Sequence, residues 1–149
     1  MPLTLRRATI DDTDAVVGLV RLYHAFEAIK FRGRATIDAL TPLLQHGDVG
    51  GIWIIELAGS TIGYIALCFG YSIELGGRDA FIDELFIVEE HRGKGFGKIV
   101  LEDIQSKARE IKVKALHLEV ERTNDRARNL YRSLGFASRE RFHLMTCAL

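Results

Sequence analysis

Cysteine is scarce in this sequence, with two residues in 149. Cys68 and Cys147 have no neighbouring cysteine and no histidine at a metal-ligand spacing, so neither a disulfide framework nor a cysteine metal site is expected. Both lie in apolar stretches that resemble strands. They therefore predict buried free thiols in a reducing cytoplasm.

Net charge and long apolar runs are also absent. Twenty Lys and Arg balance twenty Asp and Glu, so we expect no broad electrostatic surface for nucleic acid or an anionic membrane. The longest mostly apolar run, residues 62–71, is far shorter than the roughly 20 residues that a membrane span needs. No apolar core follows Arg6 and Arg7, so we expect no secretory signal and a cytoplasmic location.

The proportions of hydrophobic and charged residues are typical of a soluble globular protein. Hydrophobic residues make up 48% of the chain and charged residues 27%, which is enough for a sizeable core. The length suits one domain. Because there is no internal repeat, low-complexity tract or Pro/Ser-rich linker, the sequence predicts a single domain over residues 1–149.

The periodicity of the apolar residues predicts an α+β domain. Period-two alternation indicates strands, and apolar residues three and four apart indicate helices. The predicted strands cover residues 3–8, 53–57, 62–71, 80–88, 115–120 and 141–148, and the predicted helices cover 11–23, 37–47, 97–110 and 124–134. Turns at 58–60 and 76–79 join three strands into an antiparallel meander, and one βαβ crossover follows.

A glycine-rich loop at residues 92–98 (RGKGFGK) follows a predicted strand and opens a predicted helix. Glycines let the chain turn tightly, and the free N–H groups at a helix N-terminus favour phosphate. A dinucleotide fingerprint would need glycine in place of Lys98, and a Walker A loop would need Ser or Thr in place of Ile99. The pattern that fits is R-x-x-G-x-G, formed by Arg92, Gly95 and Gly97.

With its flanking sequence, this loop resembles the GNAT superfamily of N-acetyltransferases. The segment 81–87 (FIDELFI) resembles the family's fourth strand. Residues 118–120 (LEV), followed by N-x-x-A-x-x-L-Y-x-x-x-G-F at 124–136, resemble its fifth strand and fourth helix. The resemblance implies a mixed central sheet of six to seven strands, flanked by about four helices, with strands 4 and 5 splayed apart.

The resemblance also implies acetyl-CoA as cosubstrate and no metal. The pantetheine arm would pair with the exposed edge of the fourth strand, and the pyrophosphate would bind the loop amides; otherwise the glycines merely form a tight turn. Asn124 is predicted both to cap the last helix and to contact the pantetheine arm. The residues predicted to bind the coenzyme are Leu85, Phe86, Ile87, Arg92, Gly93, Lys94, Gly95, Phe96, Gly97, Lys98 and Asn124.

The implied reaction is direct attack of a neutral amine on the thioester in a ternary complex. The Ile87 N–H would stabilise the oxyanion, and Tyr131 would protonate the departing thiolate, unless Tyr131 is only a core residue. A base must deprotonate the amine, whose free pKa is near 10. Asp83 and Glu84 are equally good candidates for it, Glu119 is a third, and a water relay would replace all three. Asp83 and Glu84 point to opposite faces of the strand unless a bulge intervenes.

The acceptor is the least specified part of the sequence. Tyr23, His24, Glu27 and Tyr71 are predicted to contact it, and aromatic rings with carboxylates suit a small cationic amine. The alternative acceptor is a protein N-terminus or lysine side chain, and the alternative function is a coenzyme A-binding sensor without turnover. No nucleic-acid or membrane partner is expected, and the neutral charge permits a homodimer.

Overall fold

The computed structural model describes residues 2–149. Its contacts divide the chain into two compact units, one ending at Leu118 and the other spanning Glu119–Leu149. Within the described residues, the sheet and helices α1 to α3 belong to the first unit, and α4 belongs to the second. None of the helices in residues 2–149 is long and apolar enough to span a membrane.

The first unit is built on a five-stranded mixed sheet of order β1-β2-β3-β4-β5. The first four strands are antiparallel to their neighbours, and β5 runs parallel to β4. The strands are β1 (Leu3–Arg7), β2 (Gly50–Leu57), β3 (Ser60–Ser72), β4 (Gly77–Ile87) and β5 (Leu116–His117). The predicted meander and βαβ crossover are therefore confirmed.

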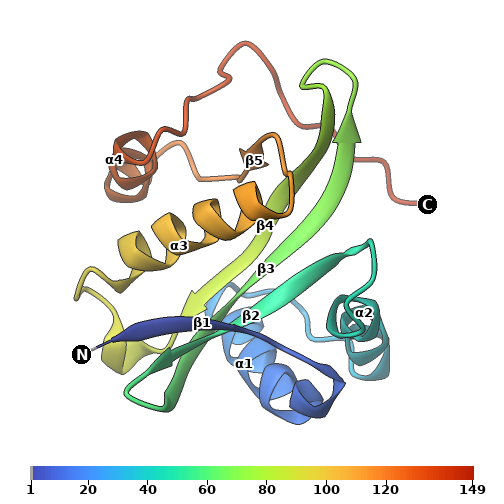
Figure 1. Ribbon diagram of the computed structural model, residues 1–149, viewed down its shortest axis with the longest axis vertical. Coiled ribbons are helices and arrows are strands. Elements are labelled where there is room, and N and C mark those ends of the chain that lie inside the picture. Colours follow the sequence, from blue (N-terminus) through green and yellow to red (C-terminus); the bar gives the residue numbers. More distant parts are fainter. Residues whose placement is uncertain (1) are drawn as a thin grey trace. The chain divides into compact units, whose positions relative to one another are not determined.

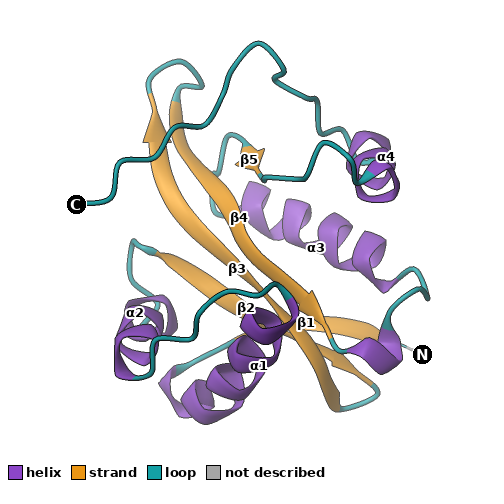
Figure 2. Ribbon diagram, turned by 180° about the vertical axis from the view of Figure 1, so that it is seen from behind, coloured by secondary structure: helices purple, strands orange, loops and turns teal. Residues whose placement is uncertain are grey.

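Helices cover both faces of this sheet. Helices α1 (Thr13–Phe26) and α2 (Arg34–Leu44) lie on one face, and α3 (Phe96–Glu110) lies on the opposite face (Figures 1 and 2). Short 3₁₀ turns at Ile10–Asp12 and Glu89–His91 precede α1 and α3. Because a sheet exposes two apolar faces, both helical layers are needed to cover its strands.

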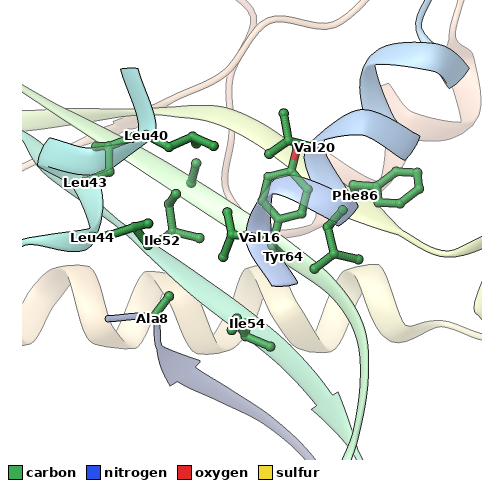
Figure 3. Packing of buried hydrophobic residues seen from close by; sticks show 12 residues of the cluster. Ala8, Val16, Val20, Leu40, Leu43, Leu44, Ile52, Ile54, Tyr64 and Phe86 are labelled. Carbon is green, nitrogen blue, oxygen red and sulfur yellow. The ribbon is translucent and has the colours of Figure 1, made fainter. Parts of the chain in front are cut away.

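The core on the α1 face joins helix and sheet side chains. Figure 3 shows Val16 and Val20 of α1 near Tyr64 of β3, and Leu44 of α2 beside Ile52 of β2, in a cluster that also includes Phe86 of β4. Each fully buried side chain of this size contributes about 1.5–3 kcal/mol to folding. The end of α1 is therefore held firmly over the middle of β3 and β4.

Alternation along β3 decides which side chains reach each face. Tyr64 and Ala66 belong to the α1-side core, so Ile65 and Leu67 between and after them face α3. Tyr64 pairs with Phe86, and Ala66 pairs with Glu84. Glu84 and Phe86 therefore share the α1 face with Tyr64.

A β-bulge lies at Asp83. Ala66 of β3 pairs with Glu84, while the next residue, Leu67, pairs with Ile82. Asp83 is therefore the extra residue that β3 leaves unpaired, and the bulge frees its side chain from strict alternation. The side chains of Asp83 and Glu84 therefore need not point to opposite faces of β4.

The free edge of β4 results from the shortness of β5. Strand β5 pairs with β4 only at Ala80–Leu116 and Phe81–His117, although the sequence predicted a strand over residues 115–120. Beyond Phe81, β4 is paired with β3 on one side, and no residue among 2–149 forms a ladder with its other side. This geometry matches the splayed strands 4 and 5 of the sequence analysis.

In the second unit, α4 (Asp125–Ser133) begins and ends as predicted. The Asn124 side chain accepts a hydrogen bond of 3.1 Å from the Ala127 N–H, which confirms it as the N-cap. Gly135 follows the helix with a φ of +92°, a conformation that favours glycine.

The predicted last strand, residues 141–148, is wrong. Residues 136–149 form neither helix nor strand in the structure, so the described sheet has five strands rather than six or seven. The prediction that both cysteines are buried is also wrong for Cys147, which is exposed, and only partly right for Cys68, which is half-buried. Alternation alone does not make a strand, because the strand's main chain needs a partner ladder.

Candidate active site

Glu84 is held at both carboxylate oxygens. The Tyr64 hydroxyl donates to Oε1 at 2.8 Å, and His24 Nε2 lies 2.8 Å from Oε2. Burial, the negative charge of Glu84 and the hydrogen bond to it raise the pKa of Tyr64 well above its ordinary value, so the phenol stays protonated as the donor. The Glu84 side chain is 18% exposed, so the fixed carboxylate is still reached from outside.

Aromatic rings from α1, from the segment between α1 and α2, and from the sheet pack around the two donors to this carboxylate. The Tyr23 ring lies 5.8 Å from Phe86, 5.9 Å from His24 and 6.3 Å from Tyr64, between ring centroids. Phe31 lies 6.2 Å from His24. We call Tyr23, Phe31, Tyr64 and Phe86 the aromatic wall. The structure thus brings two predicted acceptor residues, Tyr23 and His24, together with Glu84.

Two other predicted acceptor residues lie elsewhere. Glu27 is exposed at the C-terminal cap of α1. Tyr71, 78% exposed, stands seven residues beyond Tyr64 on β3, or roughly 23 Å at about 3.3 Å per residue. No sequence pattern separates Tyr71 from the Glu84 group, because its distance depends on the length of the β3–β4 hairpin.

Asp83 and Cys68 adjoin the same face. Burial, and then the charges of Asp83 and Glu84, raise the pKa of the Cys68 thiol to about 11. Asp83 itself is exposed on the bulge. The two carboxylates therefore act on one region, in which the Cys68 thiol is almost entirely un-ionised at neutral pH.

The outward main-chain groups at the free edge of β4 belong to Leu85 and Ile87. The Val88 N–H donates to the Ile62 carbonyl at 2.8 Å. Since inward and outward groups alternate along an antiparallel ladder, Phe86 also directs its amide to β3, whereas Leu85 and Ile87 direct theirs away. Two of the three residues predicted to pair with the pantetheine arm therefore offer main-chain groups at the edge, and the third contributes its ring to the aromatic wall.

Arg92 contacts the end of this edge. Its Nε donates to the Ile87 carbonyl at 2.6 Å, and its guanidinium lies 4.0 Å from the Phe26 ring centroid and 5.1 Å from that of Phe86. Sequence reasoning expected Arg92 to supply charge near the pyrophosphate and missed these contacts. The contact with Phe26 joins residues far apart in sequence, and the bond to Ile87, five positions away, belongs to no sequence motif.

The glycine loop is open at the N-terminus of α3. Gly93 and Gly95 have φ values of +71° and +81°, which favour glycine. No side chain caps α3, no acid lies in its first turn, and a Cβ added at Gly93, Gly95 or Gly97 would find no atom within 4 Å. The N–H groups of this turn are thus left for an anionic ligand. Lys94, Phe96 and Lys98 complete the predicted loop.

The second unit carries the remaining predicted site residues. Burial raises the pKa of Tyr131, so its phenol is protonated at neutral pH, and its ring lies 5.9 Å from that of Phe136. Glu119 is exposed. Among residues 2–149, no cluster of three or more His, Cys, Asp or Glu side chains could hold a metal ion.

The chain belongs to the acetyltransferase (GNAT) family, whose family model matches residues 19–136. It is 32% identical over 133 residues to an uncharacterized N-acetyltransferase of Archaeoglobus fulgidus, an alignment that covers 88% of this chain and 90% of the relative. The GNAT resemblance noted in the sequence is therefore confirmed.

Solved structures share the fold. An integron cassette protein, HFX_CASS3, from the mobile metagenome of Cole Harbour salt marsh has a TM-score of 0.84 and 30% identity, covering 97% of this chain and 90% of that one. A predicted acetyltransferase from Clostridium acetobutylicum, crystallised with acetyl-CoA, has a TM-score of 0.78 and 18% identity, covering 97% and 96%. The five-stranded sheet and its helices are thus a GNAT fold.

Proposed function

We propose that this protein transfers the acetyl group of acetyl-CoA to the primary amine of a small cationic acceptor. The observation that carries the proposal is the Glu84 carboxylate, fixed by Tyr64 and His24 on the strand whose outer edge is free. A general base must be held within hydrogen-bond reach of the proton it removes. Glu84 meets the need for a fixed position, and Asp83, exposed beside it, adds negative charge.

The coenzyme site fits two features of the first unit. Leu85 offers its outward N–H and carbonyl at the β4 edge and Ile87 its outward N–H, while the Ile87 carbonyl accepts from Arg92. These groups suit an extended chain containing amides. The uncapped N-terminus of α3, with Gly93 and Gly95 turning the chain, suits a diphosphate. In acetyl-CoA these two chemical groups belong to one molecule, and family membership supports the same cosubstrate.

The proposed reaction is a direct attack. The amine nitrogen forms a bond to the acetyl carbon, the carbon–sulfur bond breaks, and the amine proton passes to Glu84. The outward Ile87 N–H is suited to stabilise the oxyanion. Tyr131, protonated at neutral pH, is the proposed proton donor to the departing thiolate.

Cys68 supports direct attack over a covalent acyl-enzyme. A cysteine nucleophile reacts as its thiolate. With a pKa of about 11, the Cys68 thiol is almost entirely un-ionised at neutral pH. The cysteine nearest to Glu84 is thus poorly suited to carry the acetyl group.

The acceptor class follows from the aromatic wall and the carboxylates. Aromatic faces and carboxylates both attract an ammonium group. We therefore expect a small amine with a further positive charge, so that one nitrogen is acetylated and another remains charged.

A thiol-release assay with acetyl-CoA tests this function. The panel contains polyamines, amino acids, aminoglycosides and lysine or N-terminal peptides, and we expect the fastest turnover with a polycationic small amine. Faster turnover of peptides would assign a protein acetyltransferase. Tight acetyl-CoA binding without turnover of any amine would favour the sensor, and no binding at all would contradict the proposal.

A further inference from the structure

Apart from the tyrosines, His24 is the one polar or charged residue among 2–149 that is buried. It is 9% exposed and lies near the end of α1, between Tyr23 and Phe31. A buried polar side chain costs stability unless its hydrogen bonds are made. Its position therefore needs an explanation beyond packing.

The two ring nitrogens of His24 have different surroundings. Nε2 lies 2.8 Å from Glu84 Oε2, whereas Nδ1 is buried with no hydrogen-bond partner among the described residues. A carboxylate accepts, so the proton belongs on Nε2. If the proton were on Nδ1, that buried N–H would have no acceptor and the hydrogen bond to Glu84 would be lost. With the proton on Nε2, only a lone pair at Nδ1 is left without a partner.

We infer that His24 is a positioning residue for Glu84, acting through its Nε2–H on the carboxylate that accepts the amine proton. This inference rests on the proposed role of Glu84 as the base. The donors come from different elements, Tyr64 from β3 and His24 from α1, so together they fix the direction of the carboxylate plane. Each oxygen keeps a second lone pair for the substrate proton.

His24 does not receive the transferred proton. Its Nε2 already carries hydrogen, and its Nδ1 has no neighbour to which a proton could pass. The proton taken from the amine therefore stays on Glu84 and leaves from the exposed side of that carboxylate. His24 thus acts by fixing the geometry of the carboxylate and not as a proton relay.

The variants His24→Phe and His24→Gln separate positioning from packing. Phe keeps an aromatic ring between Tyr23 and Phe31 but removes the donor, whereas Gln places an amide N–H near the position of Nε2. With acetyl-CoA and the fastest amine of the panel, H24F should lower kcat roughly 10- to 100-fold. H24Q should recover to within about fivefold of wild type, and the KM for acetyl-CoA should change less than about twofold in both.

The double variant tests whether His24 acts through Glu84. H24F/E84Q should match E84Q within about twofold in kcat, because removing the base makes its positioning irrelevant. Independent, multiplying losses would overturn the inference. ¹⁵N spectra of the histidines should also show His24 as the Nε2–H tautomer, and an Nδ1–H tautomer would overturn it without any assay of turnover.

The controls distinguish this inference from the proposed function. The His46 Nε2–H donates to the Ala8 carbonyl at 2.9 Å, outside the site, so His46→Asn should lower Tm while leaving kcat unchanged. If E84Q loses turnover and H24F does not, the positioning role of His24 is contradicted, while Glu84 remains the proposed base. If E84Q keeps full turnover, both the assignment of Glu84 as the base and the role of His24 are contradicted.

Discussion

The Glu84 group and the glycine loop are organised in opposite ways. At Glu84, both carboxylate oxygens have hydrogen-bond partners, and aromatic rings pack around those partners. At the N-terminus of α3, no side chain caps the helix and the space around Gly95 and Gly97 is empty. A group that moves a proton must be held by the protein, whereas groups that bind a ligand must be left for the ligand to satisfy.

The sharpest test of this contrast compares the two neighbouring carboxylates. Glu84→Gln should lower kcat roughly 10²- to 10⁴-fold, the usual contribution of a general base. Asp83→Asn, the matched control next to it, should lower kcat less than about tenfold and act mainly on the KM of a cationic acceptor. Steady-state kinetics with the fastest amine of the panel measure both variants. A larger loss of kcat in D83N than in E84Q would assign the role of base to Asp83.

Tyr131→Phe should give the next largest effect. Removing the phenol deprives the thiolate of its proton donor, so we expect kcat to fall about 10- to 100-fold. The Kd of acetyl-CoA, measured by calorimetry, should stay within about twofold. Unchanged kcat together with a lower Tm would assign Tyr131 to packing against Phe136.

The glycine loop should respond in affinity rather than in turnover. Gly97 lies in the first turn of α3 with open space around it, so Gly97→Ala should raise stability by about 0.5–1 kcal/mol. The added methyl group would obstruct a diphosphate, and we expect the Kd for acetyl-CoA to rise roughly tenfold.

Gly95→Ala is the matched control for Gly97→Ala. The φ of +81° at Gly95 makes a side chain unfavourable there, so this variant should lose about 1 kcal/mol of stability or more. Thermal unfolding and calorimetry separate the two cases. An unchanged Kd for acetyl-CoA in G97A would show that the loop is only a turn.

The smallest effect is expected at Cys68. Because its pKa is raised to about 11, its alkylation rate should be very low at pH 8 and should climb until the pH passes about 11. Exposed Cys147 is the internal control and should react first. Cys68→Ala should change kcat by less than about twofold, and a pre-steady-state burst lost in C68A would instead indicate an acyl-enzyme.

Local patterns predicted most of the fold. Alternation and helical periodicity located the meander, the crossover helix and α4 with its Asn124 cap, because each depends on residues close in sequence. The same alternation was misleading at residues 141–148, where the described structure supplies no partner strand. The shortness of β5 was missed for a related reason, since pairing depends on where β4 lies.

The candidate site was predicted in its residue types but not in its contacts. The sequence singled out Glu84, His24 and the glycine loop. It could not show that His24 binds Glu84, because 60 positions separate the two residues. Tyr64 had no motif at all, and its importance appears only when β3 is paired with β4.

The order of strands and helices, the glycine turn and the family were determined by the sequence itself, because propensity, capping and periodicity act over a few neighbouring residues. The tertiary structure decided which carboxylate is held, by which donors, and which main-chain groups remain free. Those choices depend on strand register, on a bulge of one residue and on the packing of α1 over β3 and β4. They arise only when distant segments meet, since hydrogen bonds and burial act through space and not along the chain.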